Sequence, residues 1–181
     1  TDADSAAIHV VLLGFCQETG IRSVLTTQVI NWARSSVREC DIARRLAHYA
    51  VSQRVPPKHV TTDLVILRDN KLRPFGTDLL DELAGRIKDH NVRIFAEDGQ
   101  IHVLRSGKRL SDADPFRLFE RLVTELPDHV DPSHAFYLGY EMCKALTALT
   151  LSKEYRQDEA LDWGYLTVDE DFHRLARRKE Y

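Results

Sequence analysis

Residues 92–105 read VRIFAEDGQIHVLR, and this stretch decides the fold of the second half of the chain. Two alternating apolar runs, 92–97 and 100–105, flank Asp98-Gly99. An Asp-Gly pair favours the positive φ angles that a two-residue type I′ turn needs at both central positions. The stretch therefore predicts an antiparallel β-hairpin.

Helices are predicted on both sides of this hairpin. The pair Asp-Pro occurs twice after the hairpin. Asp is a favoured N-cap residue, and Pro is suited to the first helical position. A Thr-x-x-Glu capping box near the C-terminus predicts a further short helix. These signals predict a small α/β (α+β) domain with a hairpin and several helices, whose helices start at Thr77, Asp114-Pro115, Asp131-Pro132 and Thr167 with Glu170.

The first third of the chain predicts a helix, a strand, a second helix and a second strand. One helix spans 4–19 and the other ends near residue 52, and both carry apolar residues at helical spacing. The runs RSVLTT at 22–27 and TDLVILR at 62–68 are predicted to form buried strands. A helix between two strands implies a parallel strand–helix–strand unit with a right-handed connection. The expected fold class is therefore α/β.

A turn-rich stretch, RDNKLRPFGT at 68–77, predicts the boundary between two domains. We expect an α/β unit at 1–72 and an α+β domain at 73–181. A sequence of 181 residues has room for one full domain or two small ones. It is too short for a complete (β/α)8 barrel, which takes about 250 residues.

Composition excludes several classes of protein. Hydrophobic residues make up 43% and charged residues 29% of the sequence, as in globular proteins. No window approaches the run of about 18 apolar residues that a membrane-spanning helix needs. The net charge of −3 argues against nucleic acid as a partner, since nucleic-acid-binding domains carry a basic excess.

The three cysteines, Cys16, Cys40 and Cys143, are far apart and form no metal-binding or disulfide pattern. Reduced thiols of this kind are typical of a cytoplasmic protein. The first residues, TDADSAA, are acidic and polar, so they do not resemble a secretory signal. They include no initiator Met, and we expect the chain to be processed or to belong to a longer protein.

The first candidate site is the predicted loop TTQVINWARSSVRE at 26–39, which follows a strand and precedes a helix. In α/β sheets ligands bind at such loops, and a helix N-terminus favours an anion. The candidate ligand-binding residues are Asn31, Trp32, Arg34, Ser35 and Arg38, which offer an amide edge, a stacking face, positive charge and a helix cap. The alternative is a capped surface helix in which Arg38 pairs with Glu39 or Asp41.

The second candidate is one face of the helix predicted at 133–152. His134, Tyr137, Glu141 and Lys144 are three or four residues apart, so they share that face. A His and a Glu can act as an acid–base pair. They can also be metal ligands, but no third candidate ligand occurs at a spacing typical of metal sites, so no metal is expected. The alternative is a solvated or hydrogen-bonded face without chemistry.

A third stretch, YRQDEALDWGYLT at 155–167, mixes aromatic and polar residues. Such a stretch can form the rim of a pocket or an oligomer interface, or it can be a loop whose aromatic residues pack on the preceding helix. The sequence contains no glycine-rich phosphate loop, no G-x-S-x-G and no H-E-x-x-H. It therefore predicts no particular reaction, and the catalytic residues stay unknown.

The same stretches carry a resemblance to a known family. GIRSVLTTQVINWARSSVRECDIARRLAHYAV at 20–51 and DPSHAFYLGYEMCKALTALTLSKEYRQDEALDWGYLT at 131–167 resemble the C-terminal part of dihydropteroate synthase-related proteins. Those longer proteins have a pterin-binding barrel and an added C-terminal domain of unknown function. The resemblance implies that 1–72 is the end of such a barrel and 73–181 the added domain.

The resemblance also implies a function. A pterin-binding transferase of folate or methanopterin-type one-carbon metabolism is expected, with a pterin or phosphate-containing ligand and no required cofactor. The earlier barrel strands that carry the pterin-binding residues are absent from this sequence, so catalysis by this chain alone is not expected. A non-enzymatic α/β ligand-binding or assembly module is the alternative. A barrel fragment exposes strand edges that can pair with another chain, so we expect a homo-oligomer.

Overall fold

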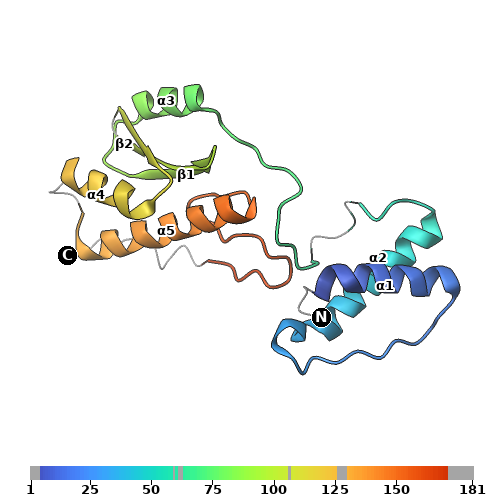
Figure 1. The fold of residues 1–181 in the computed structure, drawn as a ribbon. Coiled ribbons are helices and arrows are strands. Elements are labelled where there is room, and N and C mark those ends of the chain that lie inside the picture. The colour runs from blue at the N-terminus through green and yellow to red at the C-terminus, as the bar shows by residue number, and fades with distance from the viewer. Residues whose placement is uncertain (1–4, 59, 61–62, 106, 126–129, 171–181) are drawn as a thin grey trace, which may run out of the picture. The chain divides into compact units, whose positions relative to one another are not determined.

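The structure is a computed structural model that describes residues 5–58, 60, 63–105, 107–125 and 130–170 (Figure 1). The chain divides into two compact units, each described by itself below. Unit 1 comprises Thr1–Ile66 with Trp163–Leu166, and unit 2 comprises Leu67–Asp162 with Thr167–Tyr181. The predicted domain limits, 1–72 and 73–181, stay a prediction.

Unit 1 is built on two helices, α1 (Ser5–Thr19) and α2 (Ser36–Gln53), with a short 3-10 helix, η1 (Asn31–Ala33), before α2. Leu13 of α1 packs against Ala43 and Ala47 of α2 to form a small core. The predicted C-terminal ends of both helices are confirmed: Gly20, with a φ of 75°, follows α1, and α2 ends at Gln53 before Arg54, which takes the left-handed conformation.

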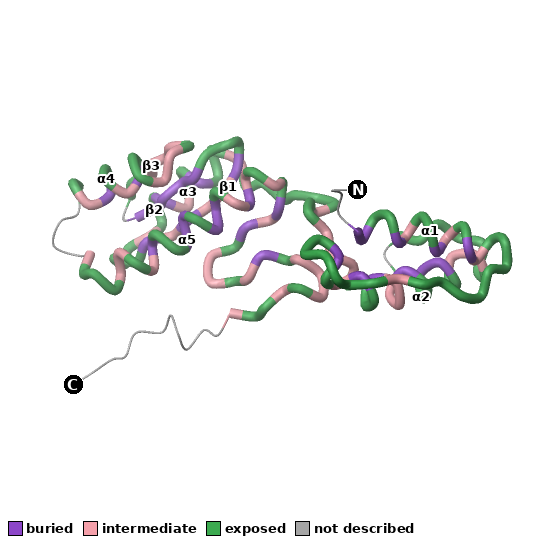
Figure 2. The backbone as a smooth tube through the Cα atoms, turned by 60° about the horizontal axis from the view of Figure 1, so that its bottom comes forward, coloured by how far each residue is buried: buried purple, intermediate pink, exposed green. Residues whose placement is uncertain are grey.

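The two strands predicted in the first third are not formed, and this part of the prediction is wrong. Residues 21–29 have no regular secondary structure, and neither do the described residues of 60–68. A β-prone run becomes a strand only where another strand supplies hydrogen bonds, and none pairs with these runs in the described part of unit 1. The segment between α1 and α2 is mostly exposed instead (Figure 2).

Unit 2 contains the predicted hairpin. Strand β1 (Arg93–Glu97) pairs antiparallel with β2 (Gln100–Arg105), and Glu97 faces Gln100 across the turn. Asp98 and Gly99 have φ angles of 51° and 72°, as the type I′ turn requires. A third strand, β3 (Lys108–Asp112), pairs with β2, so the sheet order is β1-β2-β3.

Three helices cover the two faces of this sheet (Figure 1). Leu80 and Ala84 of α3 (Thr77–Arg86) pack on Leu104 of β2. Helices α4 (Pro115–Glu125) and α5 (Pro132–Leu151) contact the sheet from the other side. The central strand is therefore buried from residue 101 to 105, and the expected α/β class with a hairpin and several helices is confirmed.

The helix starts follow the predicted caps in two cases. The Asp114 carboxylate accepts a hydrogen bond from the backbone N–H of Phe116 at 2.9 Å, and Asp131 accepts one from that of His134 at 2.7 Å. The N-cap of α3 is Gly76 rather than the predicted Thr77. Residues 167–170 form no helix, and the rest of the predicted C-terminal helix lies outside the described residues.

Candidate functional site

The first candidate residues gather at the N-terminus of α2. Ser35 occupies the N-cap position, but its side chain makes no capping bond and donates to the Glu39 Oε1 at 2.6 Å instead. Ser36 Oγ is hydrogen-bonded to Thr26 Oγ1 at 2.6 Å. No side-chain cap therefore occupies the first backbone N–H groups of α2, although the Glu39 carboxylate in the first turn offsets part of the positive helix dipole at this end.

Two exposed arginines stand at this helix end. Neither Arg34 nor Arg38 forms an ion pair with a carboxylate among the described residues. The Arg38 guanidinium lies 4.6 Å from the centre of the Tyr165 ring, also in unit 1. The alternative pairing of Arg38 with Glu39 or Asp41 does not form, since Asp41 binds two later arginines of α2.

Asn31 and Trp32 complete the cluster from η1. Trp32 is 40% exposed and Asn31 is exposed, while the next residue, Ala33, is buried and holds η1 against the unit. The backbone C=O of Trp32 accepts a hydrogen bond from Ser5 Oγ at 3.4 Å. A flat aromatic face, an amide and two cations are thus available at one helix end.

A buried polar network under this cluster was missed by the sequence analysis. Glu39 Oε2 accepts hydrogen bonds from Ser5 Oγ at 2.5 Å and from His9 Nδ1 at 3.0 Å. The other ring nitrogen of His9 lies 3.2 Å from Ser36 Oγ. Glu39 is only 1% exposed, so the network fixes the start of α2 against α1.

The sequence held a signal for this network. His9 lies four residues before Leu13, and Glu39 four before Ala43, so both polar residues occupy the apolar stripe of their helix. The order Ser36–His9–Glu39 is that of a hydrolase relay. Ser36 is 2% exposed, however, so its hydroxyl is closed to a substrate and the network joins two helices.

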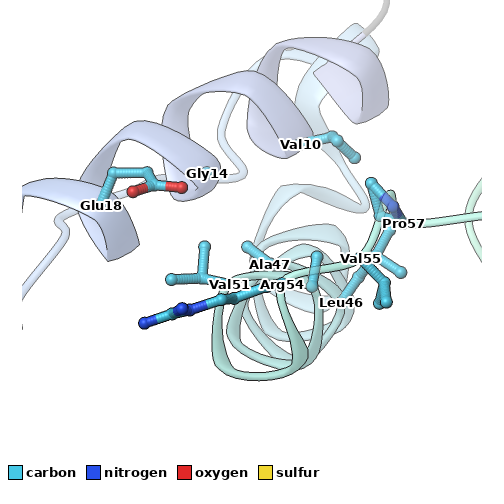
Figure 3. Close-up of a pocket in the computed structure, with 10 residues that line it drawn as sticks. Val10, Gly14, Glu18, Leu46, Ala47, Val51, Arg54, Val55 and Pro57 are labelled. Carbon is cyan, nitrogen blue, oxygen red and sulfur yellow. The ribbon is translucent and has the colours of Figure 1, made fainter.

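A hollow of about 650 Å³ lies elsewhere between α1 and α2, toward the C-terminal end of α2 (Figure 3). Its apolar walls include Val10 and Gly14 on α1 and Leu46 and Val51 on α2. It contains none of the candidate residues at the helix N-terminus. Two charged residues also line this hollow, Glu18 from α1 and Arg54 at the end of α2 (Figure 3).

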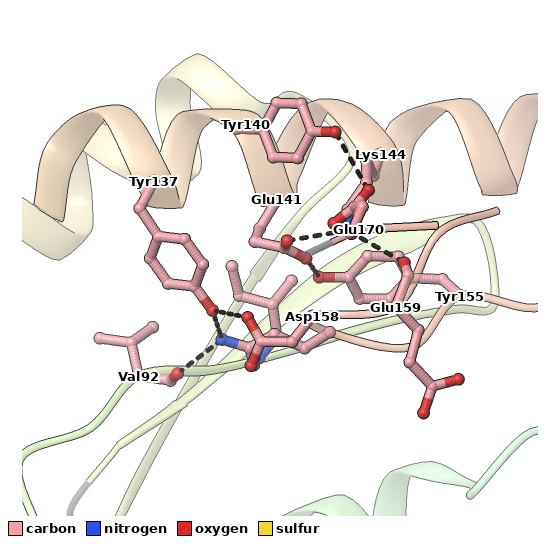
Figure 4. Close-up of polar contacts among 11 residues, drawn as sticks. Val92, Tyr137, Tyr140, Glu141, Lys144, Tyr155, Asp158, Glu159 and Glu170 are labelled. Carbon is pink, nitrogen blue, oxygen red and sulfur yellow. Dashed lines mark hydrogen bonds and ion pairs between the residues drawn. The ribbon is translucent and has the colours of Figure 1, made fainter. Parts of the chain in front are cut away.

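The second candidate face, on α5, is largely satisfied within unit 2 (Figure 4). Glu141 is fully buried, its Oε2 accepts from the Tyr155 hydroxyl at 2.7 Å, and its Oε1 lies 2.8 Å from Lys144 Nζ. Lys144 also contacts Glu170 Oε2 at 2.7 Å. Burial lowers the pKa of Lys144, but these two carboxylates outweigh it and raise that pKa.

Burial and nearby carboxylates act on the tyrosines of this network as well. Burial, followed by the charge of Glu141, raises the pKa of Tyr155 far above 10.0. Burial also raises the pKa of Tyr137, whose hydroxyl donates to Asp158 Oδ1 at 2.8 Å. Both phenols therefore stay protonated at neutral pH.

His134 stands apart from Glu141 on this helix. The two residues are two turns apart, roughly 10 Å along the axis, so they cannot act on the same proton. The His134 ring lies against Tyr137, with ring centres 6.2 Å apart. The arrangement of Glu141 and Tyr137 matches the alternative of a hydrogen-bonded face.

The described residues contain neither a candidate metal site nor a candidate membrane-spanning helix. No group of three or more His, Cys, Asp or Glu side chains there is placed to hold a metal ion. None of the described helices is long and apolar enough to cross a membrane.

Comparison with known proteins adds one similarity. No family model matches the chain, and no solved structure matches it. The chain is 24% identical over 180 residues to "Uncharacterized protein MJ0107" of Methanocaldococcus jannaschii, an alignment that covers 87% of this chain and 33% of that protein. The chain thus spans about one third of that relative's length, and the relative's name states no activity.

Proposed function

We propose that this chain is part of a dihydropteroate synthase-related, pterin-binding protein of folate or methanopterin-type one-carbon cofactor biosynthesis. The observation that carries the proposal is the pair of arginines, Arg34 and Arg38, which lack carboxylate partners in the described structure beside an uncapped helix N-terminus. Cations at this end of a helix are unfavourable for folding, because the helix dipole is already positive there. A bound anion removes that penalty.

The same cluster suits a pterin that carries a phosphate or diphosphate. The indole of Trp32 stacks on the heterocycle, and the Asn31 amide pairs with its donor and acceptor edge. Backbone N–H groups of α2 and the two arginines bind the anionic group. In this proposal the chain binds the ligand in the cytoplasm and need not catalyse the condensation by itself.

A second candidate function is assembly without chemistry, including self-association. Unit 1 exposes large apolar side chains on α1 and in the segment after it: Val11 is 74% exposed, Phe15 61%, Leu25 94% and Val29 86%. Helix α1 is apolar around most of its circumference, which is typical of a helix covered on several sides. A second copy of the chain is one cover for this surface.

Calorimetric titration tests the first function and separates binding of the pterin ring from binding of the diphosphate. The wild-type chain is titrated with a dihydropterin, with the same dihydropterin carrying a diphosphate, and with inorganic diphosphate. We expect the diphosphate-bearing pterin to bind most tightly, and Trp32→Ala to weaken the two pterins but not inorganic diphosphate. Absence of binding by all three ligands would refute the proposal, and light scattering that shows a monomer would refute self-association.

A further inference from the structure

Strand β1 is an edge of the sheet in unit 2, and a hollow of about 790 Å³ lies along it. One wall of the hollow is the segment 72–75, and the other is 152–157, which follows α5. The volume is within the range of about 300–1,000 Å³ found for ligand sites. None of the residues proposed to bind a pterin lines this hollow.

The hairpin register shows which backbone groups of β1 face the hollow. Glu97 and Gln100 flank a two-residue turn and form the closing hydrogen-bonded pair, so alternate residues of β1 point away from β2. Those residues are Ile94 and Ala96. Their backbone N–H and C=O groups therefore lie on the open edge.

The side-chain amide of Gln157 already occupies part of this edge. Its Oε1 accepts a hydrogen bond from the Ile94 N–H at 2.8 Å, and its Nε2 donates to the Val92 C=O at 3.1 Å. These two bonds resemble those that the backbone C=O and N–H of one residue in a parallel neighbouring strand would make. Among the described residues, the N–H of Ala96, the next outward position, has no hydrogen-bond partner.

Polar bonds hold both walls of the hollow in place. The Glu97 carboxylate accepts from the backbone N–H groups of Phe75 at 2.7 Å and Gly76 at 3.0 Å. On the other wall, Asp69 binds Lys153 Nζ at 2.9 Å and the Glu154 N–H at 2.8 Å. The groove along β1 is therefore formed before any partner binds, which reduces the entropy cost of binding.

The lining gives this groove a chemical preference. Leu72, Phe75 and Leu79 are 45%, 51% and 41% exposed, and the Phe75 ring packs edge-on against Phe95 at 5.2 Å. These side chains offer apolar contact to alternate residues of an added strand. The lining has four basic and three acidic side chains: Arg73, Arg93, Lys153 and Arg156, with Glu97, Asp98 and Glu154. Three of the cations each bind a carboxylate, whereas Arg73 forms no ion pair in the described part of the chain and is free to bind an acidic residue.

We infer that the β1 edge binds an extended acidic peptide segment of a partner protein, which adds a fourth strand to the sheet beyond the place held by Gln157. Backbone hydrogen bonds to Ala96 supply the pairing, and Arg73 supplies the preference for acidic side chains. An open strand edge flanked by exposed apolar residues is a template for such pairing.

The test uses the full chain and the peptide acetyl-Glu-Val-Thr-Val-Glu-amide, followed by NMR. We expect the Ala96 amide signal to shift and its hydrogen exchange to slow at least tenfold with bound peptide. Ala96→Pro removes this N–H from the outward edge and should weaken binding at least tenfold. Ser111→Pro, an outward position on the opposite edge of the same sheet, is the matched control and should leave binding unchanged.

Two further measurements do not use the proline variant, so they test the inference even if that variant does not fold. The same peptide with N-methylated amides should fail to bind the wild-type chain. Arg73→Ala, and replacement of the two peptide glutamates by glutamines, should each weaken binding at least threefold and reduce its salt dependence. Unchanged Ala96 signals at millimolar peptide, or equal affinity for the N-methylated peptide, would overturn the inference. Equal affinity for the glutamine peptide would overturn the preference of the groove for acidic side chains.

Discussion

The N-terminus of α2 and the polar face of α5 differ in how their charges are satisfied. On α5, Glu141 and Lys144 are buried, and each binds other groups of unit 2. At α2, Arg34 and Arg38 are exposed and find no carboxylate among the described residues. The same kind of sequence pattern, polar residues at helical spacing, thus produced a buried network in one case and a pair of exposed arginines without carboxylate partners in the other.

This difference has a thermodynamic meaning. Groups whose hydrogen bonds are satisfied internally stabilise the fold, and removing one leaves its partner buried and unpaired. Charges that are left unpaired contribute little to folding and remain available to a ligand. The predictions below measure this contrast as changes in the free energy of unfolding.

The largest effect is expected for Glu141→Ala. This change leaves the Lys144 ammonium with one fewer carboxylate and the Tyr155 hydroxyl without its acceptor, and should lower the free energy of unfolding by about 3–5 kcal/mol. Denaturant unfolding monitored by circular dichroism measures it. Glu120→Ala, an exposed position on α4, is the control and should change the stability by less than about 0.5 kcal/mol.

A smaller loss is expected for Glu39→Ala in unit 1. The change removes the acceptor shared by Ser5 and His9 in a buried site, so a loss of about 2–3 kcal/mol should follow. The same unfolding measurement applies, with Glu18→Ala on the exposed side of α1 as control. Equal effects of the two changes would contradict the structural role of the network.

The third prediction concerns alkaline pH and Tyr155. The pKa of Tyr155 is raised in the folded state, so the folded chain holds this proton more tightly than the unfolded chain does. Stability from this group is complete below pH 10.0 and should fall above it by about 1.4 kcal/mol per pH unit. Denaturation between pH 8 and 11 should show a shallower fall in Tyr155→Phe, and identical slopes would contradict the burial of this phenol.

The smallest effect on folding is expected at the α2 N-terminus. Replacing Arg34 and Arg38 together by Ala should leave the stability within about 1 kcal/mol of wild type, because the lost contact of Arg38 with the Tyr165 ring is offset by removal of two cations that oppose the helix dipole. Thermal unfolding without ligand measures it. A loss above about 2 kcal/mol would mean that these arginines have structural partners, and the contrast with α5 would fail.

Prediction from sequence succeeded where the determinants were local. The Asp98-Gly99 turn and the caps Asp114 and Asp131 depend on residues within four positions, and the structure confirms them. It failed at 22–27, where β-propensity was present but no partner strand was. Whether a segment becomes a strand depends on distant residues, which its own composition does not reveal.

The candidate sites follow the same rule. Spacing on one helix identified Tyr137 and Glu141 as neighbours on one face. It did not reveal that Gln157 links Tyr137 to β1, or that His9 of α1 contacts Glu39 of α2, since these pairs lie 20 and 30 residues apart. The unpaired state of Arg34 likewise became visible only with the positions of the surrounding carboxylates.

The most direct test of the proposed binding site compares the dissociation constants of three proteins. A dihydropterin that carries a diphosphate is titrated into the wild-type chain and into the variant with Arg34→Ala and Arg38→Ala, with Arg45→Ala as a control on the same helix. We predict that the double variant binds at least tenfold more weakly while the control binds like wild type. Equal affinity of all three proteins, or absence of binding by the wild-type chain, would contradict the role assigned to the α2 N-terminus.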